Sequence, residues 1–271
     1  MTPSNPTDDD LTLDALTAGV SVFQRTKGHR FSSDDVVTAW VALQVCPDPT
    51  RVLDLGCGIG SVLLHLAWSA PRSSLVGVEA QPVSVALARR NVDHNGLGHR
   101  VRILHGDLRE PAVIAAPGGP FDLITGTPPY FGVAAAIAAM DDQRAYARIE
   151  HRGGIEAYAS TAAQLLAPDG WFVVCGDAEA ADRLDRAASA CELAVCSHTV
   201  VVPRAGRSPL FCVWALRHRS EARPLVEREL TLRDHAGART DDARMLRAFS
   251  GFPEREPDRS LAPTIQTRSN T

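Results

Sequence analysis

The stretch "VLDLGCGIG" (residues 52–60) decides the fold of this sequence. Its first four residues predict a short buried strand, and three glycines, Gly56, Gly58 and Gly60, follow at once. Glycine lets a backbone turn sharply and lets a ligand approach it closely. The dinucleotide fingerprint is G-x-G-x-x-G, whereas here the third glycine comes one residue early. Asp54 would repel a pyrophosphate at this turn, so we expect a ligand that carries positive charge.

Strand-like and helix-like patterns alternate from residue 50 onward and predict the architecture around that turn. We expect strands at 51–56, 74–80, 100–107, 121–126 and 171–176, and helices at 61–70, 82–96, 155–170 (ending in a turn) and 178–191. Two further strands, 193–203 and 210–218, are joined by a loop of hairpin length. This order predicts an α/β, doubly wound, Rossmann-like sheet, mostly parallel with an antiparallel edge hairpin. In such sheets ligands bind beyond the carboxyl ends of the strands.

Composition indicates a globular enzyme, and the length suits one large domain or two small ones. The chain has 271 residues and a formal net charge of -4. We predict a flexible N-terminus over 1–17, the domain over 18–252, and a flexible tail over 253–271. The six scattered cysteines indicate reduced thiols of a cytoplasmic protein, and we expect neither export nor membrane spanning. No His and Cys cluster has metal-site spacing, so we predict no metal.

Three acids fall at the ends of three successive predicted strands: Asp54, Glu79 and Asp107. S-adenosylmethionine carries a sulfonium and an α-ammonium, which suit the carboxylate of Asp54. Glu79 can accept hydrogen bonds from both ribose hydroxyls, and Asp107 can meet the adenine amine. One such acid alone could cap a helix, but the three together predict an S-adenosylmethionine site. A nicotinamide enzyme and a degenerate fold without catalysis are the alternatives.

The predicted strand at 121–126 ends in a turn, "TPPY", that suits chemistry on a flat amine. Proline fixes its own φ and keeps the residue before it extended, so Pro128 and Pro129 hold the Thr127 hydroxyl and the Pro128 carbonyl in a fixed fork. Two such acceptors can draw the protons of an aromatic amine into hydrogen bonds, which frees its nitrogen to attack a methyl group. Tyr130 offers a ring face on which a flat substrate can stack. We expect positioning to do most of the catalysis, because the donor is already activated.

Several stretches together resemble one family, the bacterial tRNA adenine-N6-methyltransferases that modify valine tRNA beside the anticodon. They are "DLGCGIG", "VEAQPVSVALARRN", "GDL", "TPPYF", "QRTKGHRFSSDDVVTAW" (24–40), "RAYARIEHRGGIEAY" (144–158) and "LTLRDHAGARTDDARML" (230–246). The resemblance implies a class I methyltransferase fold, S-adenosylmethionine as donor and an adenine amine as acceptor. The family has Asn where this chain has Thr127, so another acceptor stays open.

The resemblance also implies a segment that folds over the cofactor and contains Gly28, Phe31, Ser32 and Asp34. The alternative is an ordinary helix start, because Ser32 can cap the residues that follow. The expected cofactor-binding residues are Phe31, Asp54, Gly56, Gly58, Gly60, Glu79 and Asp107.

Arginines at a spacing of four suggest where RNA could bind. Arg144, Arg148 and Arg152 would share one face of a helix, either as a phosphate-binding strip beside the TPPY turn or as an ordinary solvated face. Arg204 and Arg207 at the hairpin tip are a second candidate. The sequence thus favours methyl transfer to adenine N6 in tRNA. The alternatives are a protein glutamine or a small metabolite as acceptor, and a fold that binds cofactor or RNA without turnover.

Overall fold

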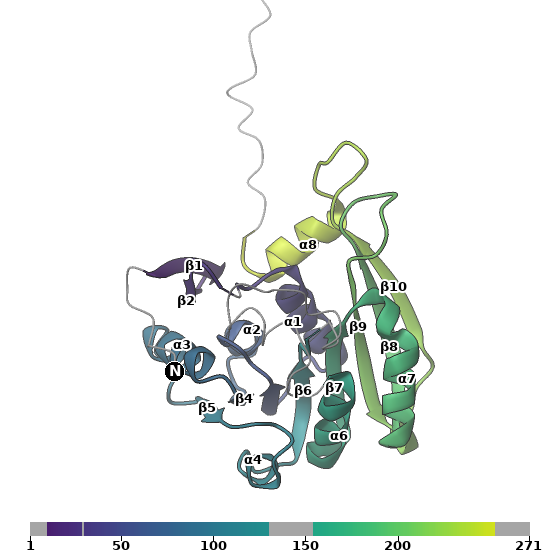
Figure 1. Ribbon diagram of the computed structural model, residues 1–271. Coiled ribbons are helices and arrows are strands. Elements are labelled where there is room, and N and C mark those ends of the chain that lie inside the picture. Colours follow the sequence, from purple (N-terminus) through teal and green to yellow (C-terminus); the bar gives the residue numbers. More distant parts are fainter. Residues whose placement is uncertain (1–9, 29, 130–153, 253–271) are drawn as a thin grey trace, which may run out of the picture.

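The computed structural model describes residues 10–28, 30–129 and 154–252 (Figure 1). The predicted stacking ring of Tyr130, the predicted RNA-binding arginines Arg144, Arg148 and Arg152, and the tail over 253–271 lie outside the described residues. Within the described ranges, no helix is both long and apolar enough to cross a membrane.

Eight strands form one central sheet in the order β10-β8-β9-β7-β6-β3-β4-β5 (Figure 1). β9 pairs antiparallel with β7 and β8, and the other pairings within this eight-stranded sheet are parallel. The predicted α/β class and the mostly parallel sheet are therefore confirmed. The strands are β3 (Arg51–Leu55), β4 (Ser74–Glu79), β5 (Val101–His105), β6 (Phe121–Gly126), β7 (Leu166–Gly176), β8 (Leu193–Val202), β9 (Phe211–His218) and β10 (Val226–Thr231).

The direction of the chain across the sheet reverses beside β3. From β3 the chain proceeds outward through β4 to β5, and it then returns to β6 on the other side of β3. Such a switch leaves a crevice beyond the carboxyl ends of the strands, where ligands bind in open α/β sheets. The helices that follow the successive strands are α2 (Ser61–Ser69), α3 (Pro82–His94), α4 (Pro111–Ala115), α6 (Ile155–Leu165) and α7 (Ala181–Ala190).

Helices cover both faces of the sheet, because its inner strands are apolar on both sides. Successive residues of one strand enter different cores. Val52 lies in one core with α1 (Ser33–Val45) and α2, whereas Leu53 lies in the other with α6 and α7, which the figures show side by side. α8 (Asp241–Phe249) packs against α1 and β10. Single 3-10 turns lie at Ala178–Ala180 and Arg219–Glu221.

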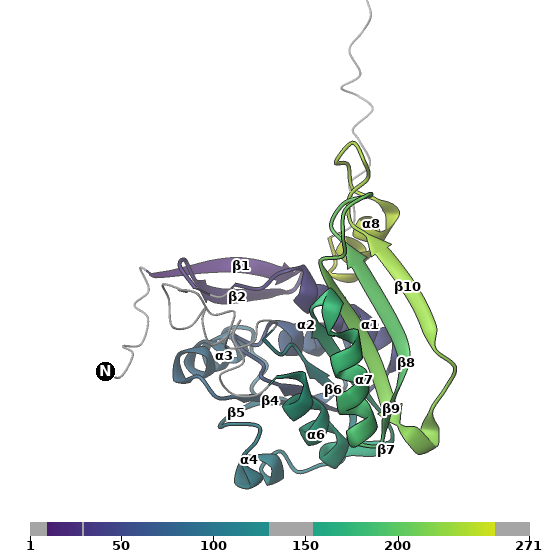
Figure 2. The same ribbon diagram turned by 45° about the vertical axis from the view of Figure 1, so that its right-hand side comes forward.

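A two-stranded hairpin, β1 (Leu11–Thr17) and β2 (Val20–Arg25), lies over α2 and α3 (Figure 2). The boundary predicted at residue 18 falls inside this hairpin, so the prediction of a flexible N-terminus is wrong for residues 11–17. The hairpin is held by side chains far along the chain. Asn91 of α3 binds both backbone groups of Phe23, 68 residues away, and Asn95 does the same with Ser21, 74 residues away. Local sequence does not reveal such partners.

The edge of the sheet also differs from the prediction. β8 and β9 form the expected antiparallel hairpin, but β8 is not an edge strand, because β10 pairs with it in parallel. The first four residues of β10 are exposed and only Leu230 is buried. Its sequence, "VERELT", therefore lacks the apolar run that marks a buried strand.

Candidate active site

A pocket opens beyond the carboxyl ends of β3, β4, β5 and β6, at the position that the topology predicts. The loops after these four strands supply most of its wall. Four of the described helices add one residue each: Asp35 from α1, Ser61 from α2, Ser84 from α3 and Tyr158 from α6. The pocket therefore collects residues from loops and helices that lie far apart in the chain.

The glycine turn after β3 has a backbone conformation that residues other than glycine rarely adopt. Gly56, Gly58 and Gly60 have positive φ angles of 64°, 57° and 89°. A Cβ on Gly58 would meet no atom within 4 Å, so this residue borders open space in the pocket. Gly60 is the N-cap of α2 and does not belong to the described pocket wall. Two of the three predicted glycines thus border the site, and the third sets the start of the helix beneath it.

Glu79 ends β4 and lines the pocket, where the sequence places it. It is buried, and two backbone amides fix its carboxylate. Oε2 accepts a hydrogen bond from the Gly58 N–H at 2.9 Å, and Oε1 accepts one from the Gln81 N–H at 2.6 Å. A carboxylate has about four acceptor sites, so Glu79 can also accept the hydroxyls of a ligand.

Asp107 also lines the pocket, but its carboxylate is turned toward Arg109. Oδ1 accepts hydrogen bonds from the backbone N–H and from Nε of Arg109, at 3.0 and 2.9 Å, and Oδ2 accepts one from Nη2 at 2.7 Å. The sequence analysis did not foresee this pairing. An amine that binds to Asp107 must share its carboxylate with an exposed guanidinium, and such surface pairs are weak.

Asp54 lies beside the pocket and is not among the described residues of its wall. It is fully buried, and its Oδ1 accepts a hydrogen bond from the Thr125 hydroxyl at 2.7 Å. Burial, together with the charge of Glu79, raises the pKa of Asp54 to about 7. Asp54 therefore lies outside the described pocket wall, where its charge can act on a ligand in the pocket.

Asp35 is a site residue that the sequence analysis missed, although it named the neighbouring Asp34. The side chain lines the pocket, where it accepts hydrogen bonds from the Ser32 N–H at 2.9 Å and from the Ser61 hydroxyl. Burial, and then the charge of Asp34, raises the pKa of Asp35 to about 8. A capping box at Ser32 was predictable from its sequence, but the entry of its acid into the pocket was not.

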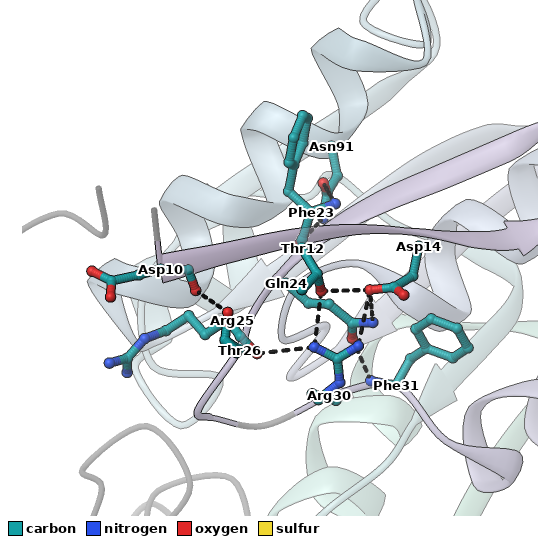
Figure 3. A network of polar contacts seen from close by, with 10 residues as sticks. All are labelled: Asp10, Thr12, Asp14, Phe23, Gln24, Arg25, Thr26, Arg30, Phe31 and Asn91. Atoms are coloured by element: carbon teal, nitrogen blue, oxygen red, sulfur yellow. Dashed lines mark hydrogen bonds and ion pairs between the residues drawn. The ribbon is translucent and has the colours of Figure 1, made fainter. Parts of the chain in front are cut away.

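The segment before α1 is fixed to the hairpin by one arginine (Figure 3). Arg30 donates a hydrogen bond from Nη2 to Asp14 at 2.9 Å, and the buried Gln24 donates to the same carboxylate at 2.9 Å. Gln24 also accepts the Phe31 N–H at 3.1 Å. Phe31 itself packs against the core beside α1 and is absent from the described pocket wall. This segment therefore brings Asp35 to the pocket and leaves Phe31 outside it.

The turn after β6 reaches the pocket, and its first residue, Thr127, lies in the pocket wall. Thr127 and Pro129 line the pocket, and Pro128 between them is buried. Of the four residues predicted to be catalytic, the structure thus brings two to the pocket wall beside the glycine turn. Tyr130 lies outside the described residues.

Tyr158 is the second site residue that the sequence analysis missed. Its ring lies against two bare backbones: a Cβ on Gly56 would be 2.0 Å from its hydroxyl oxygen, and a Cβ on Gly126 would be 2.6 Å from its Cδ1. Burial raises the pKa of Tyr158, so its hydroxyl stays protonated. The glycine directly before Thr127 was the available signal, since a strand normally carries a side chain there.

The pocket wall is acidic. Asp35, Glu79 and Asp107 line it, Asp54 lies behind it, and the described wall contains no Lys, Arg or His. Carboxylates in a weakly polarisable interior favour a cation and disfavour a phosphate. The residues present therefore fit a cationic cofactor and do not fit the pyrophosphate of a dinucleotide.

Comparison with known proteins agrees with this geometry. Residues 52–149 match the family model described as a methyltransferase domain. The chain is similar to a release factor glutamine methyltransferase of Geobacter sulfurreducens, with 34% identity over 148 residues, 52% of this chain and 50% of that protein. It is also similar to a tRNA1(Val) (adenine(37)-N6)-methyltransferase of Yersinia pestis, with 36% identity over 127 residues, 46% of this chain and 49% of that protein. The chain thus spans about half the length of the curated relatives it matches.

A solved structure shares the fold. The crystal structure of a predicted O-methyltransferase from Agrobacterium tumefaciens has a TM-score of 0.62 and 17% identity, over 81% of this chain and 97% of that one. The match to the family model runs from β3 past β6, so it contains the glycine turn, Glu79, Asp107 and Thr127. Residues 52–149 thus match a methyltransferase domain, and they lie in a doubly wound α/β sheet.

Proposed function

We propose that this protein transfers the methyl group of S-adenosylmethionine to an exocyclic amine, adenine N6 of a tRNA. One observation carries the proposal: the acidic wall and Thr127 border the same pocket. A surface that suits a cationic donor therefore lies beside a rigid turn that suits an amine. The similarity to tRNA1(Val) adenine-N6-methyltransferases supports adenine in tRNA as the acceptor.

The residues of the pocket would hold the donor by charge and by hydrogen bonds. Glu79, fixed by two backbone amides, would accept its ribose hydroxyls, and the bare backbone of Gly58 would border it. The charges of Asp35 and Asp54 would favour its sulfonium and ammonium groups. When bound, S-adenosylmethionine supplies an activated methyl group, so the protein needs no strong general base.

The turn after β6 would prepare the acceptor. The lone pair of an aromatic amine is delocalised into its ring, and hydrogen bonds from its two protons help the nitrogen to become tetrahedral. The Thr127 hydroxyl and the Pro128 carbonyl are the two acceptors, and the prolines fix their directions. The nitrogen would gain the methyl group as the carbon–sulfur bond breaks, and the surplus amine proton would pass to water.

A protein glutamine is the second candidate acceptor. Its amide nitrogen also carries two protons and fits the same fork. The similarity to the release factor glutamine methyltransferase of Geobacter sulfurreducens supports this acceptor. Thr127 favours neither acceptor, because its hydroxyl oxygen can accept a hydrogen bond from the N–H group of either one.

One experiment separates these acceptors. The protein is incubated with methyl-labelled S-adenosylmethionine and either bulk bacterial tRNA or a bacterial protein extract, and the RNA is digested for nucleoside mass spectrometry. We expect label in N6-methyladenosine. Label in protein alone would make a protein glutamine, and not adenine, the proposed acceptor. Tight binding of the donor by calorimetry without label in any pool would show a fold without turnover.

Variants of Thr127 test the role of the turn. Thr127→Val keeps the shape but removes the acceptor, and we expect kcat to fall by up to about tenfold, since one neutral hydrogen bond is worth about 0.5–1.5 kcal/mol. Thr127→Asn should raise adenine methylation. Donor affinity should stay constant in both variants. Thr50→Val, an exposed threonine before β3, is the matched control. An unchanged kcat in Thr127→Val would remove Thr127 from the mechanism.

A further inference from the structure

Two neighbouring loops, 203–210 after β8 and 232–240 after β10, form a surface rich in arginine; we call them the basic loop pair. They carry four arginines, Arg204, Arg207, Arg233 and Arg239, against one aspartate, in a chain whose net charge is -4. All four arginines are exposed. The basic loop pair thus carries a net positive charge, although the net charge of the whole chain is negative.

The two loops are joined to each other by backbone and side-chain contacts. The parallel β8–β10 ladder continues beyond the strands, since the Leu232 N–H donates to the Val202 carbonyl at 2.9 Å and the Ala205 N–H donates to the Arg233 carbonyl at 2.8 Å. Gly237 has a positive φ, and a Cβ there would be 2.9 Å from Nη2 of Arg204. Figures 1 and 2 both show the loops side by side beside α8. The arginines therefore lie on two loops that hydrogen bonds hold together.

The acids near the basic loop pair are already engaged. Asp234 accepts the Ala238 N–H at 2.9 Å and so closes its own turn. Asp241 pairs with Arg244, and Asp242 accepts the Thr231 N–H at 2.9 Å. Among the described residues no carboxylate forms an ion pair with Arg204 or Arg207. The charges of these two arginines are available to an outside anion.

The basic loop pair lies at the same edge of the sheet as the pocket. β8 and β10 run parallel to each other, and β9 runs antiparallel to both β7 and β8, so β8 and β10 point in the same sense as β3 and β6. Loops after β8 and β10 therefore share the carboxyl edge with the loops that form the pocket. A large substrate that reaches the pocket can also extend over the basic loop pair.

From this arrangement we propose that the basic loop pair binds the phosphate backbone of the RNA whose base enters the pocket. The inference rests on the proposed function, because it takes RNA as the acceptor. Arginine suits phosphate because its planar guanidinium can donate two hydrogen bonds to one phosphate group. Contacts to phosphates position a nucleic acid without reading its sequence, which leaves the choice of base to the pocket.

The test compares two double variants that remove equal charge. Arg204→Gln/Arg207→Gln changes the basic loop pair. Arg72→Gln/Arg219→Gln is the control, because Arg72 precedes β4 and Arg219 follows the antiparallel β9, so both lie at the opposite edge, exposed and paired with acids. Binding of total bacterial tRNA is titrated without donor at several salt concentrations. Thermal unfolding and donor binding of each variant show whether the fold and the pocket are intact.

We expect Arg204→Gln/Arg207→Gln to bind tRNA roughly tenfold more weakly and to lower the slope of log affinity against log salt by about 1–2, with little change in the control. Equal affinity and slope in both variants, or no tRNA binding by the unaltered protein, would overturn the inference. Displacement of tRNA by polyglutamate at matched charge would also overturn it, because the surface would then be a general anion site.

Methyl transfer is measured separately, so that the two proposals can fail separately. A protein that methylates tRNA while Arg204→Gln/Arg207→Gln binds normally would contradict the inference alone. A protein that binds tRNA through the basic loop pair but transfers no methyl group to RNA would contradict the proposed function alone.

Discussion

Two glycines at neighbouring strand ends, Gly56 and Gly126, leave the space that the ring of Tyr158 occupies. Tyr158 comes from α6, more than thirty residues after β6, yet it forms part of the pocket wall beside Thr127. A side chain on either glycine would collide with the ring. The shape of the pocket at the turn after β6 thus depends on the absence of two side chains.

Gly126→Ala should therefore destabilise the protein and displace Tyr158. The added Cβ would lie 2.6 Å from the ring, and overpacking of this kind costs about 1–3 kcal/mol. Gly98→Ala is the matched control, because a Cβ there meets only Asp93, at 3.9 Å. Urea unfolding gives both free energies. If the collision is the cause, Gly126→Ala should cost less when Tyr158→Ala is also present; equal costs in both backgrounds would contradict it.

Much of the site was predictable at this scale, and the exceptions have physical reasons. Glu79 follows from the rule that ligands bind at strand ends, because a residue's position in a strand can be read from sequence. Asp54 also lies at a strand end, but the sequence does not show whether its side chain enters the pocket or the core, and it enters the core. Asp35 and Tyr158 come from helices, and only tertiary packing brings them to the pocket.

At the scale of elements, the hairpin β1–β2 depends on two asparagines of one helix. Asn91 and Asn95 are four residues apart and so share one face of the helix. Each bonds the N–H and the carbonyl of one residue in β2, and these residues, Phe23 and Ser21, are two apart. Asn91 also donates to the carbonyl of Ile59, in the glycine turn, at 3.0 Å. The hairpin and the pocket loop are therefore held by the same side chain.

Asn91→Ala should loosen both structures. Asn91 is fully buried and makes three hydrogen bonds to backbone groups, so we expect a loss of about 2–4 kcal/mol, because backbone groups are left without partners. Asn95→Ala is the comparison and should cost less, since Asn95 is only partly buried and does not touch the glycine turn. Hydrogen exchange of residues 11–25 should quicken more in Asn91→Ala. Similar exchange in the two variants would argue against a special role of Asn91 in holding the hairpin.

The elements that sequence predicted and those it missed differ in where their stabilisation comes from. β3, β4, β6 and β7 bury apolar residues on both faces, and such runs are visible locally. β2 instead gains hydrogen bonds from residues about seventy positions away, and β10 is a largely exposed strand that pairs along one edge. Neither contribution leaves a hydrophobic pattern in the sequence.

Across the whole molecule, buried acids link stability to pH. The folded pKa values of Asp35 and Asp54, about 8 and about 7, exceed the ordinary value of 3.8. At these two residues the folded state therefore holds more protons than the unfolded state, so their contribution to stability is greatest at low pH and is lost as pH rises through 7 and 8. We expect the free energy of unfolding without ligand to fall by about 1 kcal/mol or more between pH 5 and pH 8, as measured by urea unfolding.

The affinity for a cationic donor should change with pH in the opposite sense. A cation favours the ionised carboxylates, so its binding releases protons, and calorimetry in buffers of different ionisation enthalpy would detect that release. We expect affinity for S-adenosylmethionine to rise roughly threefold to tenfold between pH 6 and pH 8. Asp35→Asn should weaken binding at pH 8 far more than at pH 6, whereas Asp48→Asn, an exposed acid, should change neither. An affinity that stays constant with pH, or a variant that loses affinity equally at both values, would mean that Asp35 does not meet the donor as a carboxylate. The acidic wall would then owe its effect to Glu79 and Asp107 alone.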